Sequence, residues 1–318
     1  MLDVRRMRVL REVARQGSFS AAADTLGFTQ SAVSQQVAAL EREAGATLVE
    51  RRGRGIRLTD AGVALVSHTD AILARLGDAE HELAAIAGLR GGRLRLGSFL
   101  SGGATLIPRA VAAFRLEHPD VELSMVEVEP EEAIDRLKAG ELDLALMYEH
   151  ESMPYGLDPA LETTHLLDDP YDVVLPRGHR LAASSRLRLS QLGAEAWICG
   201  TPRDSCQQVM IHCCNEAGFQ PRVAFETDDY HASQALVAAG VGVSLLPRLC
   251  LTTVHPDVEV RSLGRAAPVR RVFAGRLAEG YRSPATDAMI AVLSGIATKF
   301  REQGGAGHER QTAPALGA

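Results

Sequence analysis

The first residues of the chain place apolar side chains at the spacing of an amphipathic helix. Val4–Gln16 has Val9, Leu10 and Val13 on one face and charged side chains on the other. Gly17 follows directly, and glycine commonly ends a helix because it adopts the left-handed conformation at little cost. The pattern predicts a first helix over residues 4–16.

Two shorter helices are expected next, joined by a tight turn. The first should begin at a serine cap, Ser18 or Ser20, and end at Gly27. Its buried face is expected to hold small or medium side chains that let a partner helix approach closely, namely Ala21, Ala22 and Leu26.

The second helix of the pair should start after Thr29, whose hydroxyl can cap free backbone amides. Its apolar face is Val33, Val37 and Leu40, and the other faces carry polar side chains, Gln30, Ser31, Ser34, Gln35 and Gln36. Glutamine can pair with an adenine edge in the major groove, and serine can hold a phosphate. The pattern predicts a helix-turn-helix with a face suited to DNA, the alternative being an ordinary helix pair with a solvated polar face.

Residues 48–59 read as two short strands around a tip of glycine and arginine. Beside a recognition helix, such a hairpin is a wing that reaches phosphate or the minor groove. The candidate contacts are Arg51, Arg52 and Arg54.

A long stretch without proline, from Thr59 to about residue 87, predicts an extended helix. Its apolar residues follow a heptad repeat, the pattern of a two-stranded coiled coil. One heptad position is Leu65, Ile72, Ala79 and Ile86, and the adjoining one is Thr69, Leu76 and Leu83. The repeat predicts a dimer, and the alternative is a helix that lies on its own domain in a monomer.

From Arg93 onward, strand patterns alternate with helix patterns, which predicts a doubly wound α/β organisation. The order suggests two lobes, with the chain crossing near residues 164–169 and returning near Gly264. A final helix is expected over residues 284–300. The segment 303–318 lacks the periodicity needed to bury a face and is predicted to be disordered.

Charge is distributed unevenly along the chain. The 318 residues carry a net charge of −6 and are 46% hydrophobic, enough for two or three domains with real cores. Residues 1–60 hold ten arginines against seven acidic residues, a balance of +3, and leave −9 for the rest. The basic part coincides with the helix-turn-helix, as expected for a DNA-binding segment.

The N-terminus contains Asp3, Arg5, Arg6 and Arg8, and therefore has no apolar core for a signal peptide. No apolar run is long enough for a membrane span. We expect a soluble protein of the cytoplasm that has no membrane partner. Its odd number of cysteines, five, is typical of free thiols in such a compartment.

The N-terminal run GSFSAAADTLGFTQSAVSQQVAALE, followed by ERRGRGIRLTDAG, resembles the DNA-binding domain of the LysR-type transcriptional regulators. The later phrases ELDLALMY and ALVAAGVGVSLLP resemble the same family less specifically. The resemblance implies an α+β multidomain protein with a winged helix-turn-helix, a long linker helix and a two-lobed, periplasmic-binding-protein-like effector domain.

The resemblance also implies domain limits and partners. The DNA-binding domain would span residues 1–58, the linker helix 59–90 and the effector domain 91–302, with lobe I at 91–164 and 265–302 and lobe II at 165–264. The expected partners are double-stranded promoter DNA, a small-molecule effector, and further copies of the chain in a homodimer or homotetramer. RNA polymerase is a further candidate partner, and no cofactor is expected.

Effectors in such sheets lie at the carboxyl ends of strands. Four loops qualify here: residues 97–103, 127–131, 199–205 and 226–230. In the first loop, Ser98 and Ser101 keep hydroxyl positions that the family usually offers to a carboxylate, while Phe99 and Leu100 replace two others.

The second loop is acidic, with Glu129 among several glutamates, and would repel a nearby carboxylate unless these residues only complement a helix dipole. We therefore expect an effector that is more apolar than usual or carries an amine. Arg203 is the one basic group expected to hold an anion, and Tyr148 and Thr227 are expected to form walls.

The cysteines allow a redox alternative. The context of Cys214 resembles that of the second redox cysteine in peroxide-sensing members of the family, but the first would fall at Ser205, one residue before Cys206. Buried structural cysteines are the other explanation. A metal site is not expected, because Cys206, His212, Cys213 and Cys214 cannot easily converge on one ion.

The sequence contains no phosphate-binding loop, nucleophile elbow or zinc-protease motif, so we expect no enzyme. A stand-alone solute-binding protein with a fused helical segment is the competing class. It predicts no retention of DNA.

Overall fold

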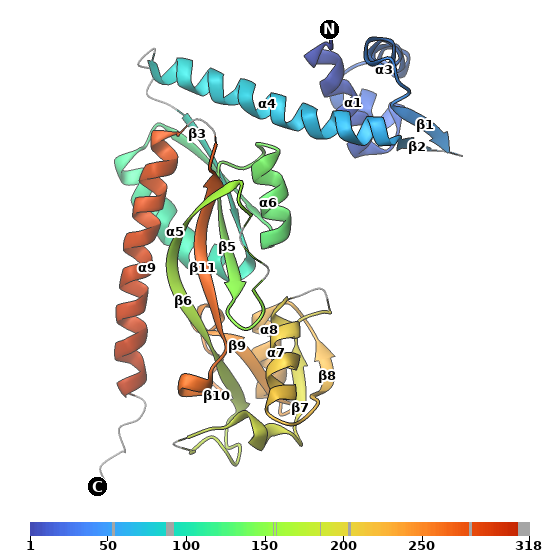
Figure 1. Cartoon of the computed structure of the whole chain (residues 1–318). Coiled ribbons are helices and arrows are strands. Elements are labelled where there is room, and N and C mark those ends of the chain that lie inside the picture. The colour runs from blue at the N-terminus through green and yellow to red at the C-terminus, as the bar shows by residue number, and fades with distance from the viewer. Residues whose placement is uncertain are drawn as a thin grey trace.

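The computed structural model consists of a helical N-terminal domain beside an elongated α/β domain (Figure 1). No described helix is long and apolar enough to cross a membrane. The described backbone comprises residues 1–52, 55–86, 92–154, 156, 158–184, 186–202, 205–279 and 282–310, and the side chains at 51, 52, 74, 78, 81, 82, 84–86 and 302–310 are not described.

Three helices build the N-terminal domain: α1 (Val4–Gln16), α2 (Phe19–Leu26) and α3 (Gln30–Ala44). Of the two serines considered as the cap of α2, Ser18 is used, since its hydroxyl accepts a hydrogen bond from the Ala21 amide at 3.1 Å. Such a bond satisfies an amide that has no partner within the helix. The predicted helix pair is confirmed.

A glycine ends each of these helices. Gly17, Gly27 and Gly45 have φ angles of 66°, 68° and 66°, in the left-handed region. Other residue types meet a steric penalty there, so the ends of all three helices are encoded locally.

The buried face of α2 differs from the sequence expectation. Phe19, Ala22 and Ala23 are buried, whereas Ala21 and Leu26 are only half-buried. Because the helix begins at Phe19, the positions three and four residues later share its face and pack on α1 and α3.

The predicted hairpin also forms. Strands β1 (Val49–Arg52) and β2 (Gly55–Leu58) pair antiparallel, from Val49 opposite Leu58 to Arg52 opposite Gly55.

Helix α4 (Asp60–Ile86) confirms the long helix, but two of its heptad positions have another use. Leu65 and Thr69 are 8% and 0% exposed, and Leu65 packs into the core of the N-terminal domain, where α4 lies against α1 of the same chain. Assigning these two residues to an intermolecular seam was therefore wrong. The threonine is tolerated there because its hydroxyl donates to the Leu65 carbonyl at 2.7 Å.

Lobe I is built on parallel and antiparallel strands. β3 (Gly92–Ser98) pairs in parallel with both β4 (Val121–Glu127) and β5 (Leu144–His150). The antiparallel strand β11 (Val269–Leu277) then joins β5 to β6 (Leu161–Pro176). Helices α5 (Leu100–Glu117) and α6 (Pro130–Lys138) connect the parallel strands and cover the sheet.

Strand β6 is longer than expected and runs through both lobes. Residues 161–170 pair with β11 in lobe I, and residues 171–176 pair with β9 (Ser244–Pro247) and β10 (Val258–Ser262) in lobe II. The segment 164–169, expected as a crossing between lobes, is therefore the middle of a 16-residue strand. Its polar residues gave no strand pattern because one face of this stretch is exposed to solvent.

Lobe II places two helices against a smaller sheet. β7 (Ala196–Cys199) pairs in parallel with β8 (Arg222–Glu226), and an isolated bridge from Trp197 to Val243 links β7 to the segment before β9. Trp197 is fully buried in the lobe II core. The elements are the 3-10 turn Leu189–Leu192, β7 (Ala196–Cys199), α7 (Ser205–Glu216), β8 (Arg222–Glu226), α8 (Tyr230–Ala238), β9 (Ser244–Pro247), the 3-10 turn η2 (Arg248–Leu251), β10 (Val258–Ser262) and the 3-10 turn Gly264–Ala266.

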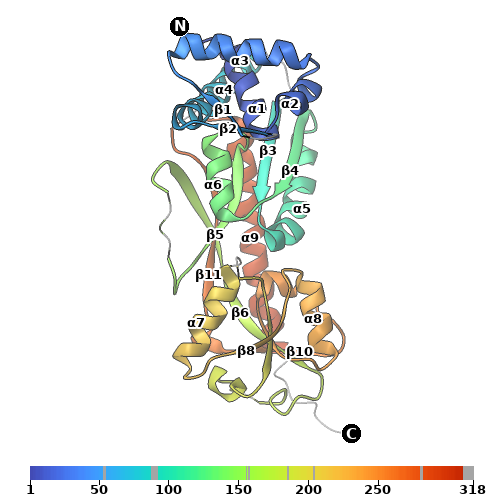
Figure 2. The ribbon, with the colours of Figure 1, turned by 90° about the vertical axis from the view of Figure 1, so that its right-hand side faces the viewer.

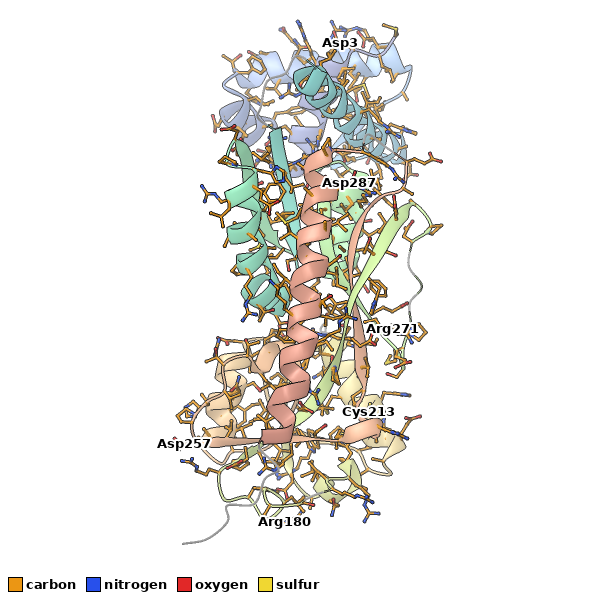
Figure 3. The ribbon with its side chains drawn as sticks, turned by 90° about the vertical axis from the view of Figure 1, so that its left-hand side faces the viewer. Asp3, Arg180, Cys213, Asp257, Arg271 and Asp287 are labelled. Carbon is orange, nitrogen blue, oxygen red and sulfur yellow. The ribbon has the colours of Figure 1, made fainter. Side chains whose placement is uncertain are left out.

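The last helix, α9 (Pro284–Arg310), continues beyond the expected end near residue 300. Residues 303–310, predicted as part of a disordered tail, are helical in backbone, and residues 311–318 lie outside the described part of the chain. Met289, Leu293 and Ala297 anchor the helix in the lobe I core. Figure 3 shows α9 passing down the α/β domain from the end that carries Asp287.

The N-terminal domain and α4 lie at the free end of lobe I, far from lobe II (Figure 2). Arg11 of α1 bonds both Asp70 of α4 and Glu141 of lobe I, at 2.5 and 2.7 Å. Farther along α4, Arg75 donates to the Glu279 carbonyl at 3.3 Å.

Candidate nucleic-acid interface and interlobe site

Helix α3 presents a polar face to solvent. Val33, Val37 and Leu40 are fully buried on the opposite face and fix the helix on the domain. Of the sequence-predicted contacts, Ser34 is half-buried and the others are exposed, namely Thr29, Gln30, Ser31, Gln35 and Gln36.

Few contacts within the chain occupy this face. The Thr29 hydroxyl accepts from the Ala32 amide at 3.2 Å and lies 3.1 Å from the Ser31 hydroxyl. Arg6 donates to the Gln36 side chain at 3.3 Å and is ion-paired with Glu43. The helix start is thus held in place while most of the polar side chains remain available to a partner.

The wing lies directly after α3. Arg51 and Arg52 belong to β1, although their side chains are not described, and Arg54 lies outside the described residues. On β2, Arg57 is exposed opposite Glu50 and adds a cation that the sequence analysis did not select.

Between the lobes, three buried polar side chains form a row across the sheet. Arg270 on β11 is paired in register with His150 on β5 and with Asp169 on β6. The three side chains are 0%, 3% and 1% exposed. Directly paired residues on one face have Cβ atoms about 5 Å apart, so the row is continuous.

Arg270 is held by a dense set of contacts. Its Nε donates to Asp169 at 2.8 Å, and its Nη2 donates to the Ser101 hydroxyl at 2.6 Å. Its guanidinium carbon lies 4.9 Å from the Phe99 ring centre and 5.0 Å from that of Tyr148. Burial opposes its charge, but the Asp169 carboxylate beside it keeps the pKa of Arg270 well above its usual range.

Arg270 is a further basic group at this site and was not selected from the sequence, where Arg203 was the one basic group expected to hold an anion. The strand VRRVFA carries a usable signal, since alternation places Arg270 on the same face as the buried Val272 and Ala274. Arg203 itself lies outside the described residues.

A chain of hydrogen bonds links the two lobes. The Tyr148 hydroxyl donates to Glu129 at 2.8 Å and lies 3.0 Å from the hydroxyl of Ser205, the first residue of α7 in lobe II. His150 Nε2 lies 3.2 Å from the same serine oxygen. Burial, followed by the charges of Cys206 and Glu129, raises the pKa of Tyr148, so the phenol stays protonated.

The structure brings most of the predicted effector residues to this junction. Ser101, Phe99 and Tyr148 surround Arg270, and Glu129 precedes α6 with its carboxylate on Tyr148. Ser98 is buried and donates to the carbonyl of Phe99 at 3.1 Å, so its hydroxyl is used within lobe I.

Thr227 lines a small cavity in lobe II whose lining does not include Arg270. Its neighbours in the lining include Cys199, Cys206, Tyr230 and Ser233. Its hydroxyl accepts from the Asp229 amide at 3.2 Å, which orders the turn before α8.

Four of the five cysteines are buried, Cys213 is half-buried, and all five are free thiols. Burial raises the pKa of Cys213 to about 11 and that of Cys214 to about 12, with smaller contributions from Glu216 and Cys213 respectively. Both stay protonated near neutral pH, which disfavours them as reactive thiolates. The described residues contain no cluster of histidine, cysteine or carboxylate side chains able to hold a metal ion.

Family comparisons agree with this architecture. Residues 4–63 match the family described as "Bacterial regulatory helix-turn-helix protein, lysR family", and residues 87–296 match "LysR substrate binding domain". The chain belongs to the LysR family of transcriptional regulators. The predicted fold, a helix-turn-helix domain followed by a LysR effector-binding domain, is confirmed.

Curated LysR-family relatives align over nearly the whole chain. A probable transcriptional regulator LrrA of Synechococcus elongatus is 31% identical over 95% of this chain and 100% of its own length. The regulator CbbR of Rhodospirillum rubrum is 30% identical over 92% and 96%, respectively.

Solved LysR-family structures share the fold. A full-length OxyR variant from Pseudomonas aeruginosa superposes with a TM-score of 0.71 at 24% identity, covering 92% of this chain and 95% of its own. CbnR superposes with a TM-score of 0.67 at 23% identity, covering 93% of this chain and 99% of its own. CbnR has also been solved in complex with its target DNA, with a TM-score of 0.66 to this chain.

Proposed function

We propose that this LysR-family regulator reads promoter DNA through the exposed face of α3, with Gln30, Ser31, Ser34, Gln35 and Gln36 in the major groove. The supporting observation is that the apolar face of α3 is fully buried while most of the polar face is free of contacts. Glutamine and serine at the start of a recognition helix suit base edges and phosphates. Thr29 holds the helix start, and Arg51, Arg52 and Arg54 of the wing engage the backbone or the minor groove.

A gel-shift assay of the purified chain on the DNA upstream of its own gene tests this function. We expect specific retardation that survives competitor DNA, with an affinity that falls as salt increases. Absence of retardation by folded protein on every upstream fragment would favour a solute-binding protein instead.

We also propose that the chain acts as a homodimer or homotetramer. On α4, Ile72, Leu76 and Leu83 are 38%, 47% and 66% exposed along the stripe that Leu65 and Thr69 begin. An exposed heptad stripe on a long helix is the pattern of a two-stranded coiled coil. Two paired helices would present two DNA-binding domains to half-sites one or more helical turns apart.

A small effector bound between the lobes would regulate this activity. Ser101, Phe99, Tyr148 and Glu129 supply its walls together with Arg270. An effector changes transcription only as far as it binds one arrangement of the lobes better than another. Because hydrogen bonds through Ser205 join the lobes at this point, a ligand here would act on their relative placement.

The remaining assignments rest on the family and the sequence. We place the protein in the cytoplasm, assign it no enzymatic activity, and expect RNA polymerase to be contacted at regulated promoters. The redox alternative has less support, since a serine occupies position 205 and Cys214 has a raised pKa.

A further inference from the structure

Two buried polar atoms at the lobe junction have no hydrogen-bond partner among the described residues: Nη1 of Arg270 and Nδ1 of His150. Both side chains are at least nine-tenths buried, and they stand directly opposite each other on β11 and β5. Buried polar atoms in folded proteins nearly always have partners. Two such atoms without a partner, on directly paired residues, therefore indicate a bound molecule that forms a hydrogen bond with each of them.

The two nitrogen atoms require hydrogen-bond partners of different kinds. A guanidinium nitrogen can only donate, so Nη1 requires an acceptor. Burial, with the Arg270 charge second, lowers the pKa of His150 to about 4, and the ring is neutral near pH 7 with one donor and one acceptor nitrogen.

The hydrogen-bond chain settles which nitrogen carries the proton. Tyr148 gives its only proton to Glu129, so the phenol oxygen accepts from Ser205. The serine has then used its proton and accepts from Nε2–H of His150. Nδ1 is left as an acceptor that requires a donor.

We propose, resting on the effector-binding function above, that this pair recognises a 2-hydroxycarboxylate. The carboxylate accepts from Arg270 Nη1 in a charge-assisted hydrogen bond, and the neighbouring hydroxyl donates to His150 Nδ1. Because Arg270 and His150 are directly paired on β11 and β5, one small ligand that carries an acceptor and a donor on neighbouring carbons can serve both atoms. A fully deprotonated oxyanion has no proton for Nδ1, and an amine without a carboxylate has no acceptor for Nη1. A 2-ammonium carboxylate would place a second cation beside the buried charge of Arg270.

The surroundings favour a tight bond at this position. The rings of Phe99 and Tyr148 flank the guanidinium and exclude water, which strengthens electrostatic contacts. Figure 1 shows β5, β11 and β6 side by side where they approach α7. A ligand on the row would therefore lie where Ser205 of lobe II meets lobe I.

The test is calorimetric titration of the full-length protein with three matched probes: lactate, propionate and lactamide. We expect lactate to bind more tightly than propionate, which lacks the hydroxyl, and than lactamide, which lacks the charge. The variant Arg270→Met with Asp169→Asn removes both buried charges, so no unpaired ion remains. It should weaken lactate binding by about 30-fold or more, and His150→Phe should abolish the preference for lactate over propionate.

Three results would overturn the proposal: no binding of lactate to folded wild type, equal affinity for lactate and propionate, or a crystal structure in lactate with a water molecule alone between the two atoms. A gel-shift assay on the same samples keeps the two proposals separate. Loss of specific DNA retardation with lactate binding intact would count against the DNA-binding function only, and the reverse result would count against the hydroxy acid only.

Discussion

His150 is a histidine held neutral by its position. It is buried between Tyr148 and Tyr171, with ring centres 5.2 and 6.0 Å away, and faces the fixed charge of Arg270. Protonating the ring would place a second cation beside a buried one. The folded state therefore resists a proton that the unfolded chain accepts near pH 6.5.

This difference predicts an acid-sensitive contribution to stability. With a pKa of about 4 when folded and 6.5 when unfolded, His150 should lower the free energy of unfolding as the pH falls through that interval. The free energy of unfolding should fall by about 3 kcal/mol in total over this interval. Urea unfolding followed by the fluorescence of Trp197, the single tryptophan, measures it at each pH.

The variant His150→Gln keeps a polar side chain at the site but cannot titrate. Its stability should fall less than that of wild type between pH 6.5 and pH 4, so the two curves converge as the pH falls. Parallel curves would show that the histidine does not titrate in this range.

Substitutions of the proposed DNA-binding residues should impair DNA binding in two distinguishable ways. Gln30→Ala should lower the preference for specific over competitor DNA by about 1–3 kcal/mol, because it removes a contact to a base edge. Arg52→Ala should weaken binding to all sequences and reduce the slope of affinity against salt by about one ion. Gel shifts at several salt concentrations separate the two, and identical behaviour would contradict this division of roles.

At the residue scale, the sequence predicted the exposed polar face of α3 better than the buried polar row between the lobes. The polar face of α3 follows from local periodicity, whereas the burial of Arg270 depends on the register of three strands that are distant in sequence. Arginine is rarely fully buried, so its residue type alone argued against a core position.

At the element scale, the apolar stripe of α4 divides into two parts. In its first turns, Leu65 belongs to the core of the DNA-binding domain and Thr69 is buried, and its later turns, with Ile72, Leu76 and Leu83, remain exposed. The same helix thus fixes one domain and leaves an apolar stripe exposed, which is the surface that we propose for the second chain.

A charged side chain introduced into the exposed apolar stripe of α4 should dissociate the proposed dimer. Leu76→Asp places a carboxylate in the proposed coiled-coil seam and is expected to convert the dimer to a monomer in analytical ultracentrifugation. Ser67→Asp adds the same charge to the opposite side of α4, where the residue is exposed, and should leave the assembly intact. Equal effects of the two variants, or a dimer that survives Leu76→Asp, would rule out this stripe as the seam.

The elements that were predicted well are those with local signals. The N-terminal helices begin at hydroxyl or carboxylate caps and end at glycines, all within a few residues. The first half of β6 has no such signal, since Leu161–Pro170 contains several polar residues and a proline. It becomes a strand because β11 pairs with it along its length. Tertiary pairing of this kind is invisible to a pattern within one segment.

On the scale of the whole molecule, α6 lies between the effector site and the DNA-binding domain. Glu129, just before the helix, bonds Tyr148 at the lobe junction. Glu141, just after it, bonds Arg11 of the DNA-binding domain. A shift of this nine-residue helix would therefore change both contacts, the one at the lobe junction and the one with the DNA-binding domain.

Removing either side of the Arg11 contact should loosen the attachment of α1 to lobe I. Arg11→Gln and Glu141→Gln are each expected to speed hydrogen exchange in residues 4–16, and Arg11→Gln more so because it also breaks the pair with Asp70. The double variant should add little to Arg11→Gln, because the pair with Glu141, which contributes below about 1 kcal/mol, is already lost in that single variant.

Arg271→Gln is the matched control. It removes an exposed ion pair with Glu151 within lobe I, at 2.7 Å, and should leave exchange in residues 4–16 unchanged. Similar acceleration by all three variants would mean that the Arg11 contact has no specific role in holding the domains together.

The continuous strand β6 limits how this protein can be recombined with its relatives. A cut anywhere between residues 161 and 176 divides a strand that is hydrogen-bonded in both lobes. A chimaera that exchanges lobe II alone would have to join two half-strands in register, since a slip of one residue turns every side chain to the other face. New effector specificities are therefore more readily acquired by exchanging the whole effector domain, at the boundary after α4, than by exchanging one lobe.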